Sequence, residues 1–333
     1  MVAHWRVGGR LVRAGATCAI VAALVTACGT AGGNSSNASN ATGATSEAAT
    51  RTIKTVKGDV TIPAHPQRIV TDYYAGELIS VGGHVVGAAP LEFGNPFLKD
   101  QLKDATDVGD PINVEKALSL KPDLIVTDSD KNYDELSKIA PTLYIPFGTT
   151  HNIQETVRFF ENIVGEKEQG EQVLAQYEKA AENGRNALKG VIDPKATAGL
   201  YELTDKGDLW VFGDNFGRGG QALYNALQMK MPPKLAESKK EYLQISLETL
   251  PQYAADYMFL TTYDPQHKGQ ALKDLRQSPV WNGLKAVKEG DVFYNDFNTF
   301  YPYDPISITK QIDLFVRMLT EKAKEQQGQS SGQ

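Results

Sequence analysis

Residues 53–150 carry two hydrophobic patterns that follow one another along the chain. Short apolar runs, such as Ile69 to Thr71 and Leu124 to Thr127, are bounded by Pro, Gly or Asp, which is typical of buried strands. Between the runs, apolar residues recur at helical spacing, as in Gly76 to Val81 and Val114 to Leu120. Strands that alternate with helices in this way predict an N-terminal α/β lobe with a parallel sheet.

Residues 151–190 follow a single helical pattern. No Pro occurs between Ile153 and Leu188, and apolar residues recur at helical spacing. We therefore expect one long connecting helix, jogged at Gly165 and Gly170. The alternative is two ordinary helices that form a hairpin.

Residues 191–325 again combine strand and helix patterns and predict a C-terminal α/β lobe. A strand is expected from Ala198, and a closing amphipathic helix near the end of the segment. The apolar face of this helix is formed by Ile308, Ile312, Phe315 and Leu319. The polar residues 326–333 predict a disordered tail.

One supersecondary unit occurs twice, at residues 113–126 and 245–259. Each copy begins as a short helix-like stretch near a Glu, which is Glu115 in the first copy and Glu248 in the second. An Asp follows eight residues after that Glu, and an apolar run typical of a buried strand follows the Asp. A unit repeated at such a distance indicates two similar lobes rather than one continuous core.

Residues 1–27 have the pattern of a signal peptide. A basic stretch from His4 to Arg13 precedes an apolar stretch that is too short to span a membrane as a helix. The segment ends in Leu-Val-Thr-Ala before Cys28, which resembles the lipobox of bacterial lipoproteins. That resemblance implies cleavage before Cys28 and lipid, such as palmitate, on its thiol and amine; the alternative is an ordinary signal peptide with a chance Cys. Small and polar residues dominate 28–52, which predicts a flexible tether.

Charge and motif content argue against several classes of function. The formal net charge is -6, and it becomes about -9 without residues 1–27, which contain three Arg and no acid. An acidic body argues against nucleic-acid binding. The chain has no phosphate-binding loop, no G-x-S-x-G and no H-E-x-x-H motif, so nothing in the sequence supports nucleotide binding or an enzyme activity. No metal-ligand spacing connects the scattered His65, His84, His151 and His267.

Several segments resemble one family, the substrate-binding lipoproteins of ABC importers for iron-siderophores and cobalamin. They are Pro66–Val70, Gly76–Ile79, Val108–Val126, Gly217–Gly220 and Trp281–Val292. The resemblance implies a class III periplasmic-binding-protein architecture, in which one long helix joins two Rossmann-like α/β lobes and the ligand lies between them. It also implies a monomeric, lipid-anchored binding protein, not an enzyme, on the extracytoplasmic face of the cell membrane.

The same resemblance gives the two repeated acids a role. In this family, acids at the positions of Glu115 and Glu248 dock into Arg-bearing pockets of the membrane permease. The expected partner is therefore an ABC permease dimer with its ATPase. Charge pairs of this kind orient a complex more than they tighten it. The alternative is that both acids only stabilise helix N-termini.

Aromatic residues gather in the loops where the family holds its ligand, beside Gly, Asp and Asn. The candidate ligand-binding residues are Tyr73, Tyr74 and Phe93 in the first lobe, and Tyr201, Trp210, Arg218, Tyr263, Tyr301 and Tyr303 in the second. Core packing is the alternative for each aromatic residue. A surface salt bridge is the alternative for Arg218, which could otherwise hydrogen-bond the oxygens around a ferric centre.

The charge of these loops favours one class of ligand. A ferric tris-catecholate is strongly anionic and would call for several clustered cations, whereas the loops offer Arg218 and few others. We therefore expect a ferric siderophore of the hydroxamate or citrate-hydroxamate type, with a ferric catecholate, cobalamin and haem as alternatives. The chelator supplies the iron ligands, so the protein itself needs no cofactor or metal site.

Overall fold

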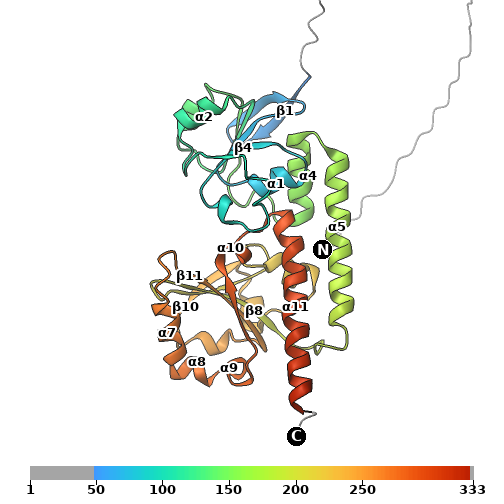
Figure 1. Cartoon of the computed structure of the whole chain (residues 1–333), viewed down its shortest axis with the longest axis vertical. Helices are drawn as coiled ribbons and strands as arrows, with labels where there is room; N and C mark the ends of the chain where they lie inside the picture. The colour runs from blue at the N-terminus through green and yellow to red at the C-terminus, as the bar shows by residue number, and fades with distance from the viewer. Residues whose placement is uncertain (1–48, 331–333) are drawn as a thin grey trace, which may run out of the picture. The chain divides into compact units, whose positions relative to one another are not determined.

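A computed structural model of the protein describes residues 49–330 (Figure 1). The predicted signal peptide, Cys28 and the first part of the predicted tether lie outside the described residues. Strand β1 (Thr50–Thr55) begins inside the segment 28–52, so the prediction that the tether extends to residue 52 was wrong. The small polar residues before β1 hid this start, because β1 is only half-buried and carries a single buried side chain, Ile53.

The N-terminal lobe is built on a five-stranded parallel sheet in the order β5-β4-β3-β6-β7, which confirms the predicted parallel α/β lobe. The strands β3, β4 and β6 are buried along their whole length, as expected where helices cover both faces of a parallel sheet. The strands are β3 (Ile69–Thr71), β4 (Val85–Ala88), β5 (Thr106–Asp107), β6 (Leu124–Thr127) and β7 (Thr142–Tyr144). Around them lie the antiparallel partner of β1, β2 (Gly58–Pro63), the helices α1 (Ala75–Ser80), α2 (Val114–Leu120) and α3 (Tyr133–Leu136), and the 3-10 helix η1 (Glu92–Gly94).

The C-terminal lobe is built on a mixed five-stranded sheet in the order β10-β9-β8-β11-β12. Strands β8, β11 and β12 are parallel, whereas β9 and β10 run antiparallel to their neighbours. The strands are β8 (Ala198–Thr204), β9 (Leu209–Phe212), β10 (Tyr242–Ile245), β11 (Tyr257–Tyr263) and β12 (Val292–Asp296). The helices are the π-helix η2 (Gln221–Ala226), α6 (Pro233–Ser238), the 3-10 helix η3 (Leu250–Gln252), α7 (Gln270–Gln277), α8 (Pro279–Gly283), α9 (Lys285–Glu289) and α10 (Phe297–Phe300).

The segment predicted as one connecting helix forms two helices, α4 (Ile153–Val164) and α5 (Lys167–Leu188). Arg158 on α4 pairs with Glu171 on α5 at 2.7 Å, so the chain reverses between them. Gly165 makes the reversal, because it ends α4 with a φ of 89°, a conformation that favours Gly. The prediction of one helix over residues 151–190 was therefore wrong, and the alternative of a helical hairpin is confirmed. The connection between the lobes is made by α5, which contacts α1 in one lobe and η2 in the other.

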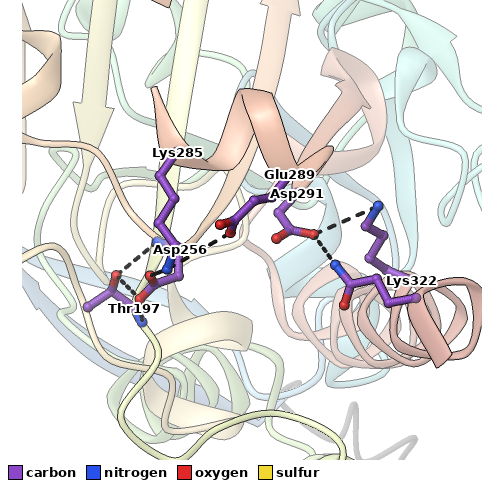
Figure 2. Close-up of polar contacts among 7 residues, drawn as sticks. Thr197, Asp256, Lys285, Glu289, Asp291 and Lys322 are labelled. Carbon is purple, nitrogen blue, oxygen red and sulfur yellow. Dashed lines mark hydrogen bonds and ion pairs between the residues drawn. The ribbon is translucent and has the colours of Figure 1, made fainter. Parts of the chain in front are cut away.

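The last helix, α11 (Pro305–Ser330), runs beside α5 and also contacts both lobes (Figure 1). Its predicted apolar face is confirmed, since Ile308, Ile312, Phe315 and Leu319 are all buried. The prediction that the tail is disordered from residue 326 was wrong, because α11 continues to Ser330. Lys322 lies one turn before Gln326 on α11 (Figure 2). Both side chains reach Asp291, just before β12, at 3.8 and 2.9 Å respectively. These contacts keep a polar segment helical.

The two Asp residues of the repeated unit accept backbone hydrogen bonds in the same way in both lobes. The carboxylate of Asp123, before β6, accepts hydrogen bonds from the backbone N–H groups of Gln67 and Arg68 at 2.7 and 2.8 Å. The carboxylate of Asp256, before β11, accepts from the backbone N–H of Thr197 at 2.9 Å and from Lys285 at 2.9 Å (Figure 2). Each Asp thus holds the chain that enters the neighbouring parallel strand, β3 or β8.

The helical part of the repeat differs between the copies. The first copy forms α2, with Asn113 as its N-cap and Pro122 beyond its end. The second copy forms only a turn and η3, because Pro251 lies inside the segment and supplies no backbone N–H for an α-helix. The expectation of a helix-like stretch is therefore confirmed as an α-helix in the first copy only.

We predict that Asp123→Ala lowers the free energy of unfolding by about 1–2 kcal/mol, because two backbone N–H groups lose a charged acceptor. Urea unfolding followed by circular dichroism measures the change. Asp205→Ala, which removes an exposed carboxylate from the β8–β9 turn, is the matched control and should change stability by less than about 0.5 kcal/mol. Equal effects of the two substitutions would contradict the role of Asp123.

Candidate functional site

The two lobes enclose a cavity of about 240 Å³, which we call the ligand cavity. From the N-terminal lobe, Tyr73 follows β3, Asp128 follows β6 and Phe147 follows β7. The carboxyl ends of parallel strands meet at one edge of a sheet, where such folds bind ligands. The C-terminal lobe completes the lining with Phe216, Arg218, Tyr301 and Tyr303.

Aromatic rings from the two lobes touch across the ligand cavity. The ring centroid of Phe147 lies 5.1 Å from that of Phe216 and 5.8 Å from that of Tyr303, and the rings meet edge to face. The ring of Tyr73 lies 6.3 Å from that of Tyr303. Phe147 also borders a second interlobe cavity of about 230 Å³, which Tyr74 lines together with residues of both lobes. Phe147 and its partners therefore separate two neighbouring cavities.

Arg218 lies in a glycine-rich loop after β9 and has a φ of 56°, in the left-handed region. Its Nε donates a hydrogen bond to Oε2 of Glu202 at 2.8 Å, and its Nη2 forms an ion pair with the same oxygen at 2.7 Å. Only 11% of the Arg218 side chain is exposed. It also lies 4.4 Å and 4.7 Å from the ring centroids of Phe212 and Tyr301. The salt-bridge alternative for Arg218 therefore holds, although the pair is buried rather than on the surface. Glu202 balances the positive charge at the wall of the ligand cavity.

A small chamber of about 30 Å³ adjoins the ligand cavity, and we call it the acidic chamber. Its carboxylates are Glu77 on α1, Glu92 on η1 and Asp304 before α11. Asp304 accepts hydrogen bonds from the backbone N–H groups of Ile306 and Ser307, both at 3.0 Å. Among the described residues, the carboxylate of Glu77 accepts only from its own backbone N–H, and that of Glu92 has no such donor.

Burial governs the ionisation of these groups. Burial and the neighbouring Asp304 raise the pKa of Glu77 well above its ordinary value. Burial and the charges of Glu77 and Asp304 do the same to the pKa of Glu92. The pKa of Asp304 is raised by burial, although its hydrogen bonds from Ser307 oppose the shift. In the ligand cavity, burial and the nearby Asp110 raise the pKa of Asp128.

The structure brings together some of the predicted ligand-binding residues and separates others. Tyr73, Arg218, Tyr301 and Tyr303 line the ligand cavity. Tyr74 lines the second cavity, but it is buried and donates its hydroxyl to the backbone oxygen of Ile145 at 2.7 Å.

The prediction that Tyr201 binds the ligand was wrong. It is fully buried in the core on the other face of the C-terminal sheet, where its hydroxyl hydrogen-bonds the backbone oxygen of Tyr253. Its neighbour Glu202 points to the cavity side instead, because successive side chains of a strand point to opposite faces.

The remaining candidates lie around the cavities without lining them. Phe93 lies exposed on η1. The ring of Trp210 lies 5.9 Å from that of Tyr242, which borders the second cavity. Tyr263 is 40% exposed and packs on Phe297, which stacks on Tyr301. Direct ligand contact is therefore not proposed for these three residues.

Sequence reasoning missed Asp128, Phe147 and Phe216, which complete the ligand cavity. Phe147 carries the signal that selected Tyr73, an aromatic residue just after an apolar run, and Phe216 lies inside the glycine-rich loop that selected Arg218. Asp128 is neither aromatic nor cationic, and the predicted ligand-binding residues were of these two kinds.

The two acids predicted to dock a permease lie on the surfaces of different lobes. Glu115 is exposed in the first turn of α2. Glu248 is exposed in the turn before η3, where hydrogen bonds from its own backbone N–H and the Ser246 hydroxyl lower its pKa. Both are therefore available to a partner that spans the two lobes.

Within residues 49–330, no helix has the length and apolar character needed to cross a membrane. In the same part of the chain, no group of three or more His, Cys, Asp or Glu side chains is arranged to hold a metal ion.

Comparison with known families defines the class of protein. The family described as periplasmic binding protein matches residues 80–299. The chain belongs to this family, which confirms the resemblance read from the sequence and the fold of two α/β lobes. Members of the family bind solutes, so the expectation of a binding protein rather than an enzyme is also confirmed.

Individual relatives are similar to this chain over most of their length. The iron(3+)-hydroxamate-binding protein YxeB of Bacillus subtilis is 53% identical over 272 residues, which cover 81% of this chain and 85% of the relative. The iron(3+)-hydroxamate-binding protein FhuD of the same organism is 34% identical over 273 residues, 79% of this chain and 84% of the relative. The structure of FhuD2 from Staphylococcus aureus with bound ferrioxamine B is similar with a TM-score of 0.69 and 28% identity, covering 78% of this chain and 100% of that chain.

We predict that Glu77→Gln stabilises the protein above pH 5 and has little effect at pH 4. A carboxyl whose pKa is raised by folding binds more protons in the folded state, so the folded state loses stability as the pH rises through and beyond the ordinary pKa. Gln does not ionise and escapes this loss, so the stability gained by the variant should grow as the pH rises from 4 to 7.5.

Urea unfolding of both proteins across this pH range measures the difference. Glu135→Gln on the exposed side of α3 is the matched control and should show no such pH dependence. A Glu77→Gln protein that is less stable than the parent at pH 7.5 would contradict the account of burial.

Proposed function

We propose that this chain captures a ferric hydroxamate siderophore in the cavity between its lobes and delivers it to an ABC permease. The observation that carries the proposal is the charge of the ligand cavity. Arg218 is paired with Glu202, and Asp128 adds a further carboxyl, so the lining has no excess of positive charge. A strongly anionic ferric tris-catecholate would gain little from such a lining, whereas a neutral or cationic complex would pay no charge penalty.

The aromatic rings of the cavity suit the same class of ligand. A hydroxamate complex exposes a largely apolar chelator around its iron, and the tyrosine and phenylalanine rings offer apolar area with hydroxyl groups at their edges. Two similar relatives, YxeB and FhuD, are named iron(3+)-hydroxamate-binding proteins, which supports the proposal.

The sizes of the cavities indicate how such a ligand enters. Sites for ligands of this size usually enclose roughly 300–1,000 Å³, more than either the ligand cavity or the second cavity at about 240 and 230 Å³. Phe147 separates the two and is 41% exposed, and Gly148 beside it has a φ of 81° with open space around it. We infer that the ligand displaces the ring of Phe147 and occupies both cavities together.

Delivery and location complete the proposal. Glu115 and Glu248 contact the two halves of a permease dimer that works with its ATPase. The protein acts as a monomer on the extracytoplasmic face of the cell membrane, held by lipid on Cys28. Relatives that are themselves described as lipoproteins, at 32% and 26% identity, support the anchor.

A titration with ferric chelators tests the ligand class. We predict that a ferric hydroxamate quenches tryptophan fluorescence with a Kd below about 1 μM, because Trp210 lies beside Tyr242 at the second cavity. The iron-free hydroxamate and a ferric tris-catecholate should have little effect at the same concentrations. A preference for the catecholate, cobalamin or haem would contradict the proposal.

An uptake experiment tests the docking acids. The double substitution Glu115→Lys and Glu248→Lys should leave ligand affinity unchanged and reduce iron uptake by cells at least about tenfold, because like charges then face the arginines of the permease. The double substitution Glu135→Lys and Glu321→Lys reverses two other exposed acids and is the matched control. Normal uptake with the first pair of substitutions would rule out the docking role.

A further inference from the structure

The acidic chamber opens onto the same tyrosine wall as the ligand cavity. Tyr73, Tyr301 and Tyr303 line both spaces. A chamber of about 30 Å³ has room for a group the size of one water molecule. A ligand held in the ligand cavity can therefore extend one small group past the tyrosines into the acidic chamber.

The chemistry of the acidic chamber selects what that group can be. The side chain of Glu77 is buried, with only 4% of the residue exposed, and no other described residue donates a hydrogen bond to its carboxylate or pairs with it. Glu92 likewise has no ion-pair partner in the described part of the chain. Among the residues that line the acidic chamber, none is Lys, Arg or His. The carboxylates of this chamber thus face tyrosine hydroxyls and asparagine amides but no positive charge.

We propose that the acidic chamber binds a primary ammonium group carried by the ferric hydroxamate siderophore, with Glu77 as its main partner. An ammonium group has three N–H donors and is about as large as a water molecule, so it matches both the free acceptors and the volume. The faces and hydroxyls of the bordering tyrosines also favour a cation. This inference rests on the proposed function and adds a requirement on the end group of the ligand.

A bare metal ion is a poorer occupant of the acidic chamber. Hard cations such as Ca²⁺ and Mg²⁺ take six or more oxygen ligands in a set geometry. The carboxylate of Asp304 is already engaged by Ile306, Ser307 and Asn95. The described residues accordingly contain no group of acids placed to hold a metal ion.

Binding of an ammonium group should release a proton from the protein. The groups that face Glu77 are Glu92 from η1 and Asp304 just before α11. The hydroxyls of Tyr73 and Tyr74 after β3 and of Tyr303 after α10 face it as well. None of these groups is positively charged, and burial beside Asp304 raises the pKa of Glu77 well above its ordinary value, which favours the protonated form. An ammonium group next to Glu77 stabilises the carboxylate, which then gives its proton to solvent.

The test compares two ferric complexes of one linear trihydroxamate, one ending in a primary amine and the other with that amine acetylated. Calorimetry of the full-length protein at pH 7.5, in two buffers of different ionisation enthalpy, measures both the Kd and the protons released. We expect the amine complex to bind at least about tenfold more tightly and to release a proton, whereas the acetylated complex releases none. Glu77→Gln should weaken binding of the amine complex about tenfold more than binding of the acetylated complex. Glu135→Gln on α3 should preserve the preference.

Each outcome decides a different question. Equal affinities of the two complexes for the parent protein would overturn the ammonium site and leave the proposed function intact. No binding of either complex would overturn the proposed function and this inference with it. Retention of the tenfold preference by a folded Glu77→Gln protein would also overturn the assignment of Glu77.

Discussion

The packing of α11 against α5 holds the two lobes together. Both helices contact both lobes, so they hold the binding edges of the two sheets in register. Gly184 on α5 lies against Leu227, Ile312 and Val316, where a side chain would not fit, so the two helices approach closely. The buried face of α11 makes this contact apolar along most of its length. A stiff pair of helices of this kind favours small movements of the lobes over a wide opening.

This constraint explains why the ligand cavity consists of rings and balanced charges. Loops from three parallel strands of one lobe meet a glycine-rich loop and the segment before α11 of the other, and their aromatic rings touch across the boundary. Arg218 is buried here with Glu202, because an unpaired guanidinium would be costly in such a place. The cavity therefore recognises a ligand by apolar area, shape and hydrogen bonds more than by net charge.

The acidic chamber shows a different balance between stability and function. The start of α11 brings Asp304 close to Glu77 and Glu92, and all three carboxyls have a raised pKa because they share a buried space. Groups that are costly to ionise and lie beside a ligand site are typical of functional positions. An ammonium group would supply the missing positive charge and stabilise the buried carboxylates. Burial of these carboxyls lowers the stability of the free protein, but it lets the site favour a ligand that carries an ammonium group.

Most local elements could be predicted from the sequence, because hydrophobic periodicity and turn residues act over a few positions. The sequence predicted the parallel N-terminal lobe, the apolar face of α11, and Tyr73, Arg218, Tyr301 and Tyr303 as residues that prove to line one cavity. Only the tertiary structure decided that Tyr201 belongs to the core and Glu202 to the cavity wall, since strand alternation gives two faces without saying which one meets the other lobe. The meeting of Glu77 with Asp304 also depends on segments distant in the chain, whose approach no local pattern records.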